Sequence, residues 1–188
     1  MLRGAALIAA AIAAVNPSLP EATRLSYAHG VELAARRAQV DPLLIVAIIH
    51  GESRWQPGLV GGLDGACVGL GQVCLHIYPE CRDGFETPAC AAKREQLRDP
   101  FVNLAMIGVH LSKWRTWCFK KTHHRPHAKN LLFAYGGWNS PSRNLWCGMT
   151  QRHGKWVEAP TPKTVRRTLS TYLNLRRLVQ VPHTRSKS

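Results

Sequence analysis

The chain has 188 residues, of which 45% are hydrophobic, so it predicts one domain with a packed core, or one domain with a small appendage, and excludes a disordered chain. No apolar run reaches the roughly 18–20 residues of a membrane-spanning helix, which excludes a polytopic membrane protein. The net charge of +14 is concentrated in residues 100–188, which contain 16 basic residues and one acidic residue, Glu158. This excess of positive charge favours a polyanionic partner: nucleic acid, an anionic membrane or an anionic cell wall.

Residues 1–15 have the pattern of a short signal peptide. A basic start precedes an apolar run from Gly4 to Val15, which Asn16-Pro17 ends, and Ala11-Ile12-Ala13 is a small-x-small cleavage pattern. We therefore expect an exported protein that is periplasmic, secreted or associated with the cell wall. Two alternatives apply to the same residues: an ordinary buried helix, and an uncleaved, weakly hydrophobic membrane anchor.

The next elements are two helices and a glycine-rich segment. Apolar residues at helical spacing predict an amphipathic helix over residues 20–39. Asp41-Pro42 then supplies an N-cap and a proline for the first turn of a second helix. Because residues 43–49 are apolar on every side, this second helix is expected to be buried. The glycine-rich residues 57–74 predict turns with a short hairpin.

The rest of the chain is mainly helical by its pattern. Residues 75–99 form a cysteine-bearing insertion without a clear period, and Asp99-Pro100 starts a helix with an apolar stripe. Beyond Trp114 the pattern predicts a basic, histidine-rich loop at 118–127, a short helical turn at 130–135, a loop at 136–162, a basic helix at 164–179 and a flexible basic tail at 181–188. These elements predict a domain over 20–180 of the α+β class, mainly α, with a small glycine-rich β-hairpin.

Six cysteines in a small basic chain favour disulfides over zinc, because no C-x-x-C or H-x-x-x-H pair brackets the cysteines at zinc-finger spacing. Six cysteines allow 15 connectivities. We expect Cys81–Cys90, which closes a short local loop, and Cys118–Cys147, which ties the loops around Tyr135. The remaining pair is Cys67–Cys74, across the glycine-rich hairpin.

Glu52 is the candidate catalytic residue. It comes directly after the buried helix, so both desolvation and the negative end of the helix dipole disfavour its carboxylate. We therefore expect a raised pKa for Glu52, and a carboxyl group that stays protonated near neutral pH is a general acid. The alternative is an ordinary surface glutamate at the end of a helix.

The surroundings of Glu52 resemble the lytic transglycosylases of the soluble (SLT) type, which share the lysozyme-like fold. Five segments resemble the family's motifs in the family's order: residues 41–53 with Glu52-Ser53, 65–72 with Gly69-Leu70-Gly71-Gln72, 99–104 with Asp99-Pro100 and Asn103, 133–137 with Ala134-Tyr135, and 162–173. The sequence departs from these motifs by one residue of spacing in the second segment, by Gly71 where methionine is usual, and by Gly136 in place of asparagine. The resemblance covers residues 22–180.

This resemblance implies cleavage of the β-1,4 bond between N-acetylmuramic acid and N-acetylglucosamine, with formation of a 1,6-anhydro sugar. Glu52 would act as general acid and then as base, assisted by the N-acetyl group of the substrate. The resemblance further implies that Ser53, Gln72 and Asn103 contact the sugar or orient Glu52, and that Tyr135 forms a hydrogen bond near it. From its place beside Tyr135, we expect Trp138 to stack on a sugar ring.

Two other functions remain open. Asp64 is a possible second carboxylate, and if it positions a water the protein is a hydrolytic lysozyme, since two-carboxylate glycosidases place their acids about 5–10 Å apart. The other alternative is a non-catalytic basic protein that binds wall polymer or nucleic acid, although no nucleic-acid-binding module is recognisable.

We expect a monomer that acts on peptidoglycan, with anionic wall polymers and a secretion, conjugation or phage machine as further partners and with no specific nucleic acid. His123, His124 and His127 could form a metal cluster, but Pro126 and the surrounding cations favour a solvated basic loop. Neither a metal nor a cofactor is expected.

Overall fold

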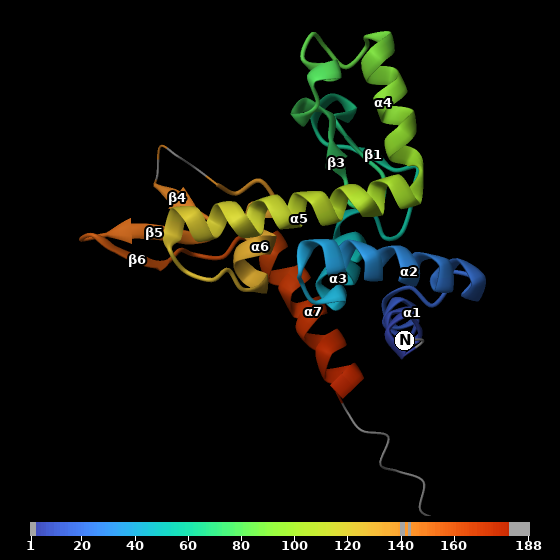
Figure 1. Ribbon diagram of the computed structural model, residues 1–188, viewed down its shortest axis with the longest axis horizontal. Coiled ribbons are helices and arrows are strands. Elements are labelled where there is room, and N and C mark those ends of the chain that lie inside the picture. Colours follow the sequence, from blue (N-terminus) through green and yellow to red (C-terminus); the bar gives the residue numbers. More distant parts are fainter. Residues whose placement is uncertain (1–2, 140–141, 143, 181–188) are drawn as a thin grey trace, which may run out of the picture.

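The computed structural model describes residues 3–139, 142 and 144–180, and the predicted tail at 181–188 lies outside them. It is mainly helical with two small antiparallel sheets, which confirms the predicted class (Figure 1). The helices are α1 (Arg3–Val15), α2 (Glu21–Ala38), α3 (Pro42–Glu52), α4 (Pro88–Arg98), α5 (Pro100–Thr122), α6 (Ala128–Tyr135) and α7 (Lys163–Gln180). The strands are β1 (Val60–Gly61), β2 (Cys67–Val68), β3 (Val73–Cys74), β4 (Leu145–Trp146), β5 (Met149–Arg152) and β6 (Lys155–Glu158).

Helix α3 forms the centre of the main core. Its residues 43–49 are each no more than 4% exposed, and α1, α2 and α7 pack around it. Asp41 caps the helix as expected, because its carboxylate accepts a hydrogen bond of 3.0 Å from the backbone N–H of Leu43, with Pro42 in the first turn. A helix that is apolar on all sides is stable only when other elements enclose it. This packing fixes the position of the C-terminal end of α3 in the fold.

Helix α1 is packed into the same core. Ile8 and Ile12 are fully buried, and the helix contacts α2, α3 and α7. The segment with the signal-peptide pattern is thus packed as a buried helix, which was the alternative interpretation. Its cleavage as a signal peptide stays a prediction. Within the described residues, no helix combines the length and the apolar character needed to cross a bilayer.

A second lobe stands on one side of α5 (Figure 1). It consists of β1–β3, α4 and three short 3₁₀ turns, Leu63–Gly65, Leu75–Ile77 and Pro79–Cys81. Its own small core contains Val68, Val73, Leu75 and Leu97 together with the Cys81–Cys90 disulfide. Helix α4 was missed in the sequence because only Cys90 and Leu97 are buried in it, which leaves no readable apolar period.

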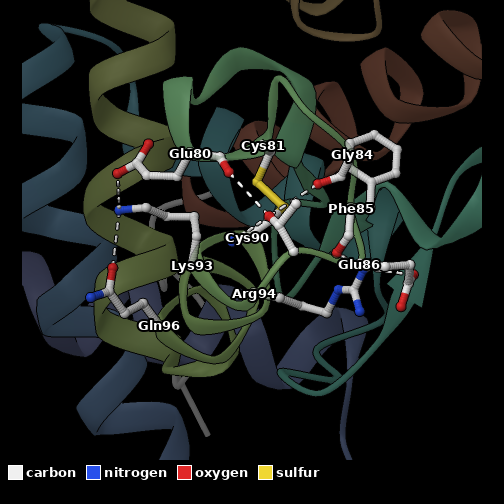
Figure 2. The surroundings of a disulfide bond; sticks show 10 residues. Glu80, Cys81, Gly84, Phe85, Glu86, Cys90, Lys93, Arg94 and Gln96 are labelled. Atoms are coloured by element: carbon white, nitrogen blue, oxygen red, sulfur yellow. Dashed lines mark hydrogen bonds and ion pairs between the residues drawn. A yellow bond between two sulfur atoms is a disulfide. The ribbon is translucent and has the colours of Figure 1, made fainter.

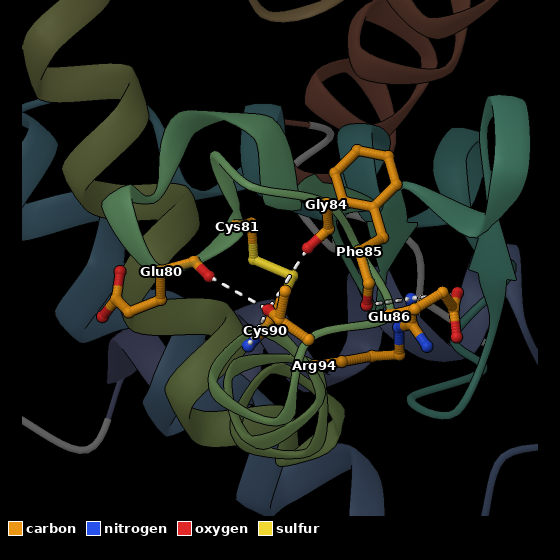
Figure 3. Close-up of polar contacts among 8 residues, drawn as sticks. Glu80, Cys81, Gly84, Phe85, Glu86, Cys90 and Arg94 are labelled. Carbon is orange, nitrogen blue, oxygen red and sulfur yellow. Dashed lines mark hydrogen bonds and ion pairs between the residues drawn. A yellow bond between two sulfur atoms is a disulfide. The ribbon is translucent and has the colours of Figure 1, made fainter.

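The Cys81–Cys90 bridge is surrounded by polar contacts that fasten α4 to the preceding loop (Figure 2). The side-chain ammonium of Lys93 lies 3.6 Å from the Glu80 carboxylate and donates a 3.0 Å hydrogen bond to Gln96. On the other side of the bridge, the guanidinium of Arg94 donates to the backbone carbonyl of Phe85 at 3.3 Å (Figure 3).

The second sheet, β4–β6, replaces the loop expected at 136–162. Strands β5 and β6 pair up to Arg152 and Lys155, so the connecting turn has two residues, His153 and Gly154, both with positive φ. Positive φ at both residues is the backbone conformation of a tight hairpin turn. In a sequence, Asn-Gly or Asp-Gly predicts such a turn, whereas His-Gly does not. The sheet projects beyond α6 in Figure 1.

All three predicted disulfides are present: Cys67–Cys74, Cys81–Cys90 and Cys118–Cys147. They join β2 to β3, the 3₁₀ turn before α4 to α4, and α5 to the turn after β4. Three disulfides are typical of proteins that fold in an oxidising compartment, in agreement with export.

Candidate active site

Glu52 is the last residue of α3, and its side chain reaches a cleft of about 450 Å³. Both lobes contribute to the walls of this cleft. The β2–β3 hairpin contributes Gln72, in its turn, and the Cys67–Cys74 disulfide. Helix α5 contributes His110 and Trp114, and the end of α6 with the residues after it contributes the segment from Tyr135 to Trp138. A second, much smaller cavity shares Glu52, Tyr135 and Trp138 with the cleft and extends toward α7. The fold thus brings Glu52, Gln72, Tyr135 and Trp138 together, as the sequence predicted.

Partial desolvation raises the pKa of the Glu52 carboxyl above its ordinary value. Glu52 is exposed on its cleft side, but the walls of the cleft leave its carboxylate less hydrated than that of a glutamate in water. Loss of hydration disfavours the charged form. The expectation of a raised pKa for Glu52 is therefore confirmed, and the group keeps its proton to a higher pH than a glutamate in water.

Tyr135 is coupled to Glu52 electrostatically. Burial of the phenol and, second to it, the Glu52 carboxylate raise the pKa of Tyr135 well above its usual value. The hydroxyl donates a 2.8 Å hydrogen bond to the backbone carbonyl of Gly71. Tyr135 therefore lies near Glu52, and its proton is directed toward the glycine-rich loop.

The two glycines that depart from the family's motifs, Gly71 and Gly136, have a steric reason at this place. A Cβ atom on Gly71 would collide with Ile107 and would lie 2.6 Å from the Tyr135 hydroxyl. A Cβ atom on Gly136 would lie 3.0 Å from the indole of Trp138. Glycine at these two positions lets Tyr135 and Trp138 occupy the space that a side chain would otherwise take.

Asn103 does not line the cleft, which corrects its expected role as a sugar ligand. Its side chain is fully buried, accepts a 2.8 Å hydrogen bond from the N–H of Gly71, and donates to the carbonyls of Val68 and Leu97 at 2.9 and 2.8 Å. With these contacts it holds the loop that carries Gly71 against α5. None of these bonds involves Glu52, so the orienting role, the other half of the expectation, stays a prediction.

Ser53 is also buried, with 2% of its surface exposed, and does not reach the cleft. Its hydroxyl donates to the carbonyl of Ile49 at 3.3 Å and accepts from the N–H of Trp55 at 3.2 Å. These bonds close the last turn of α3, which carries Glu52. Ser53 therefore does not contact the cleft, and its orienting role stays a prediction.

Gln72 and Asp64 occupy different places relative to the cleft. Gln72 lines it, and its amide donates hydrogen bonds of 3.1 Å to the carbonyls of Leu59 and Gly69. Asp64 is exposed on the 3₁₀ turn Leu63–Gly65, two residues after Gly62. Gly62 lines the cleft and Asp64 does not, so Glu52 is the only carboxylate among the described lining residues.

His76 and His110 also line the cleft, and the sequence analysis missed them. Burial, with Lys113 and His76 nearby, lowers the pKa of His110, so its imidazole is neutral over a wider pH range. Its Nε2 is buried without a hydrogen-bond partner among the described residues. The helical spacing of Asn103, His110 and Trp114 along one face of α5 was the signal that could have revealed it.

No known family model, curated protein or solved structure matches this chain. The resemblance therefore rests on the motifs around Glu52 alone, and the activity that it implies is a proposal.

Proposed function

We propose that this protein is an exported peptidoglycan lytic transglycosylase with a lysozyme-like fold. The observation that carries the proposal is Glu52: a carboxyl group with a raised pKa, placed in a cleft between a helical core and a small sheet-containing lobe. Glycan-cleaving enzymes need a proton donor of this kind beside the scissile oxygen. The cleft also offers the indole of Trp138, 44% exposed, for stacking on a sugar face.

In this proposal Glu52 acts twice. The protonated carboxyl donates its proton to the glycosidic oxygen, which leaves on N-acetylglucosamine, while the N-acetyl oxygen of muramic acid bonds to the anomeric carbon. The resulting carboxylate then removes the proton of the muramic acid 6-hydroxyl, whose oxygen attacks the same carbon and displaces the N-acetyl oxygen. The 1,6-anhydro product forms without net consumption of water, and Glu52 ends protonated.

A hydrolytic lysozyme is the second candidate. It requires a second carboxylate that holds a water, or a covalent intermediate, close to the sugar. The placement of Asp64 outside the described lining of the cleft favours the mechanism with one carboxylate. A basic protein that binds wall polymer without cleaving it is the third candidate. The positive charge of residues 100–188 does not distinguish it from the enzyme, because an active enzyme with this charge would also bind anionic wall polymers.

The direct test is Glu52→Gln, which keeps the shape of the side chain and removes the titrating proton. We expect clearing of a peptidoglycan suspension to slow by at least about two orders of magnitude, the usual share of general acid–base catalysis. The matched control is Glu86→Gln on the exposed loop before α4, where the side chain is 93% exposed; it should clear at the wild-type rate. Near-normal clearing by Glu52→Gln would refute the assignment.

A further inference from the structure

A separate cavity, of about 620 Å³, lies at the opposite end of α3 from Glu52. Asp41 and Leu44 at the start of α3 line it, together with Phe119 of α5 and Leu131 of α6. Since α3 rises about 1.5 Å per residue, this cavity and the Glu52 cleft are separated by roughly 15 Å along the helix. A volume of a few hundred Å³ is that of an ordinary small-molecule site.

Two arginines give this cavity its charge. Arg115 of α5 and Arg125 of the following loop both line it, and neither takes part in an ion pair within the described part of the chain. The Nε of Arg115 is buried and has no hydrogen-bond partner among the described residues. Buried donors are normally satisfied, so the Arg115 guanidinium keeps hydrogen-bonding capacity that the described residues do not use.

The carboxylate in the described lining, that of Asp41, does not neutralise these arginines. One of its oxygens caps α3 through the N–H of Leu43. The other accepts a 3.1 Å hydrogen bond from the hydroxyl of Tyr172 and lies 3.7 Å from the guanidinium of Arg176. Asp41 is therefore already paired, and the cavity retains the positive charge of Arg115 and Arg125.

The rest of the wall is mixed, because apolar side chains stand beside the polar ones of Gln39, Thr116, His127 and Tyr172. The apolar part of the lining consists mainly of Val40, Leu44 and Leu131. Phe119, which is 54% exposed, also lines the cavity. Guanidinium groups bind carboxylate and phosphate oxygens with paired, charge-assisted hydrogen bonds. An apolar wall beside such groups selects ligands that carry an apolar body next to the anion.

We propose that this cavity is a binding site for a carboxylate or phosphate group attached to a small apolar body, separate from the Glu52 cleft. Arg115 and Arg125 hold the anion, and Phe119 with its aliphatic neighbours covers the apolar part. The site does not depend on the proposed glycan cleavage, because none of its described lining residues lines the cleft.

Three probes with one common ring test the proposal on the full chain with its disulfides intact. Phenylacetate carries a carboxylate, phenyl phosphate carries a phosphate, and phenylacetamide is the neutral counterpart. In a titration followed by NMR at fixed ionic strength, we expect at least one anion to bind with a millimolar or tighter dissociation constant and to shift the signals of Phe119 and Tyr172. The tighter anion identifies the headgroup. Equal binding of phenylacetamide, or no binding of either anion at about 10 mM, would overturn the proposal.

Variants locate the site. Arg115→Gln and Arg125→Gln should each weaken anion binding about tenfold, because each removes a charge-assisted hydrogen bond. The control Arg152→Gln removes the same charge from the exposed end of β5, outside the cavity lining, and should leave the affinity within about twofold, since that charge is screened by solvent and salt. Arg125 is exposed, so its variant keeps the test valid if Arg115→Gln does not fold. Equal losses in Arg125→Gln and Arg152→Gln would show a general charge effect and contradict the site.

Discussion

The chemistry of the cleft depends on how a few buried side chains hold Glu52 and Tyr135. Ser53 closes the last turn of α3, and Asn103 holds the loop whose Gly71 carbonyl receives the Tyr135 hydroxyl. Neither Ser53 nor Asn103 lines the cleft. The cost of desolvating Glu52 is a feature of such sites, where a group is kept ready to react at the expense of stability.

That cost predicts a pH-dependent gain of stability for Glu52→Gln. Below the ordinary pKa of glutamate, both the folded and the unfolded wild type are protonated, so the carboxyl does not affect stability. Because the folded pKa of Glu52 is raised, the wild type loses stability as the pH rises through the window from the ordinary to the raised value. The Tm of the variant relative to wild type should therefore increase across this window and then stay constant. Calorimetry at several pH values checks this, with Glu86→Gln, which should show no such increase, as the control.

Gly71 is predicted to be indispensable for the position of Tyr135. The Cβ of Gly71→Ala collides with Ile107 and the Tyr135 hydroxyl, and overpacking of this kind costs about 1–3 kcal/mol of stability. We expect a lower Tm and slower peptidoglycan clearing. Gly58→Ala is the matched control, since no atom lies within 4 Å of the added Cβ. A wild-type Tm and rate for Gly71→Ala would contradict the placement of Tyr135.

At the scale of elements, strong local signals could be predicted and weak ones could not. The Asp41-Pro42 start and the apolar run of α3 were correct because capping and burial act within one helix. Helix α4 and the β4–β6 sheet were missed, since α4 is largely exposed and the sheet turns at a His-Gly pair. The residues of the cleft were predicted where motifs named them, but the burial of Ser53 and Asn103 depends on contacts between distant segments, which no spacing shows.

Helix α1 supports a prediction of its own. Ile12 is fully buried between helices, so Ile12→Ala in the full chain should lower the free energy of unfolding by about 2–5 kcal/mol. Leu7→Ala on the same helix, where the side chain is 39% exposed, should cost clearly less. Chemical denaturation of both variants measures the difference. Equal and small losses would show that α1 does not belong to the folded domain.

At the scale of the whole molecule, the charge distribution predicts salt-dependent adhesion to the wall. Residues 100–188 carry 16 basic residues and one acidic residue. We expect Glu52→Gln, which cannot digest its support, to sediment with peptidoglycan that carries anionic polymers at about 0.1 M salt and to be released near about 1 M, where the screening length falls from ~10 Å to ~3 Å.

The origin of this adhesion is tested by two double variants in that background. Arg166→Gln with Arg167→Gln removes two exposed charges of α7 and should shift release to lower salt. Arg37→Gln with Arg82→Gln removes two exposed charges from the first 99 residues and should shift it less. Sedimentation that is independent of salt, or equal shifts for both pairs, would contradict an electrostatic origin in the second half of the chain.

The most direct test of the account is the mass of the products released from peptidoglycan by the wild-type protein with its disulfides intact. The single-carboxylate mechanism at Glu52 predicts anhydromuropeptides, each one water lighter than the corresponding hydrolysis product. Products with ordinary reducing ends would contradict it and direct attention to Asp64. The absence of any soluble product, with protein bound to the wall, would contradict the enzymatic account as a whole.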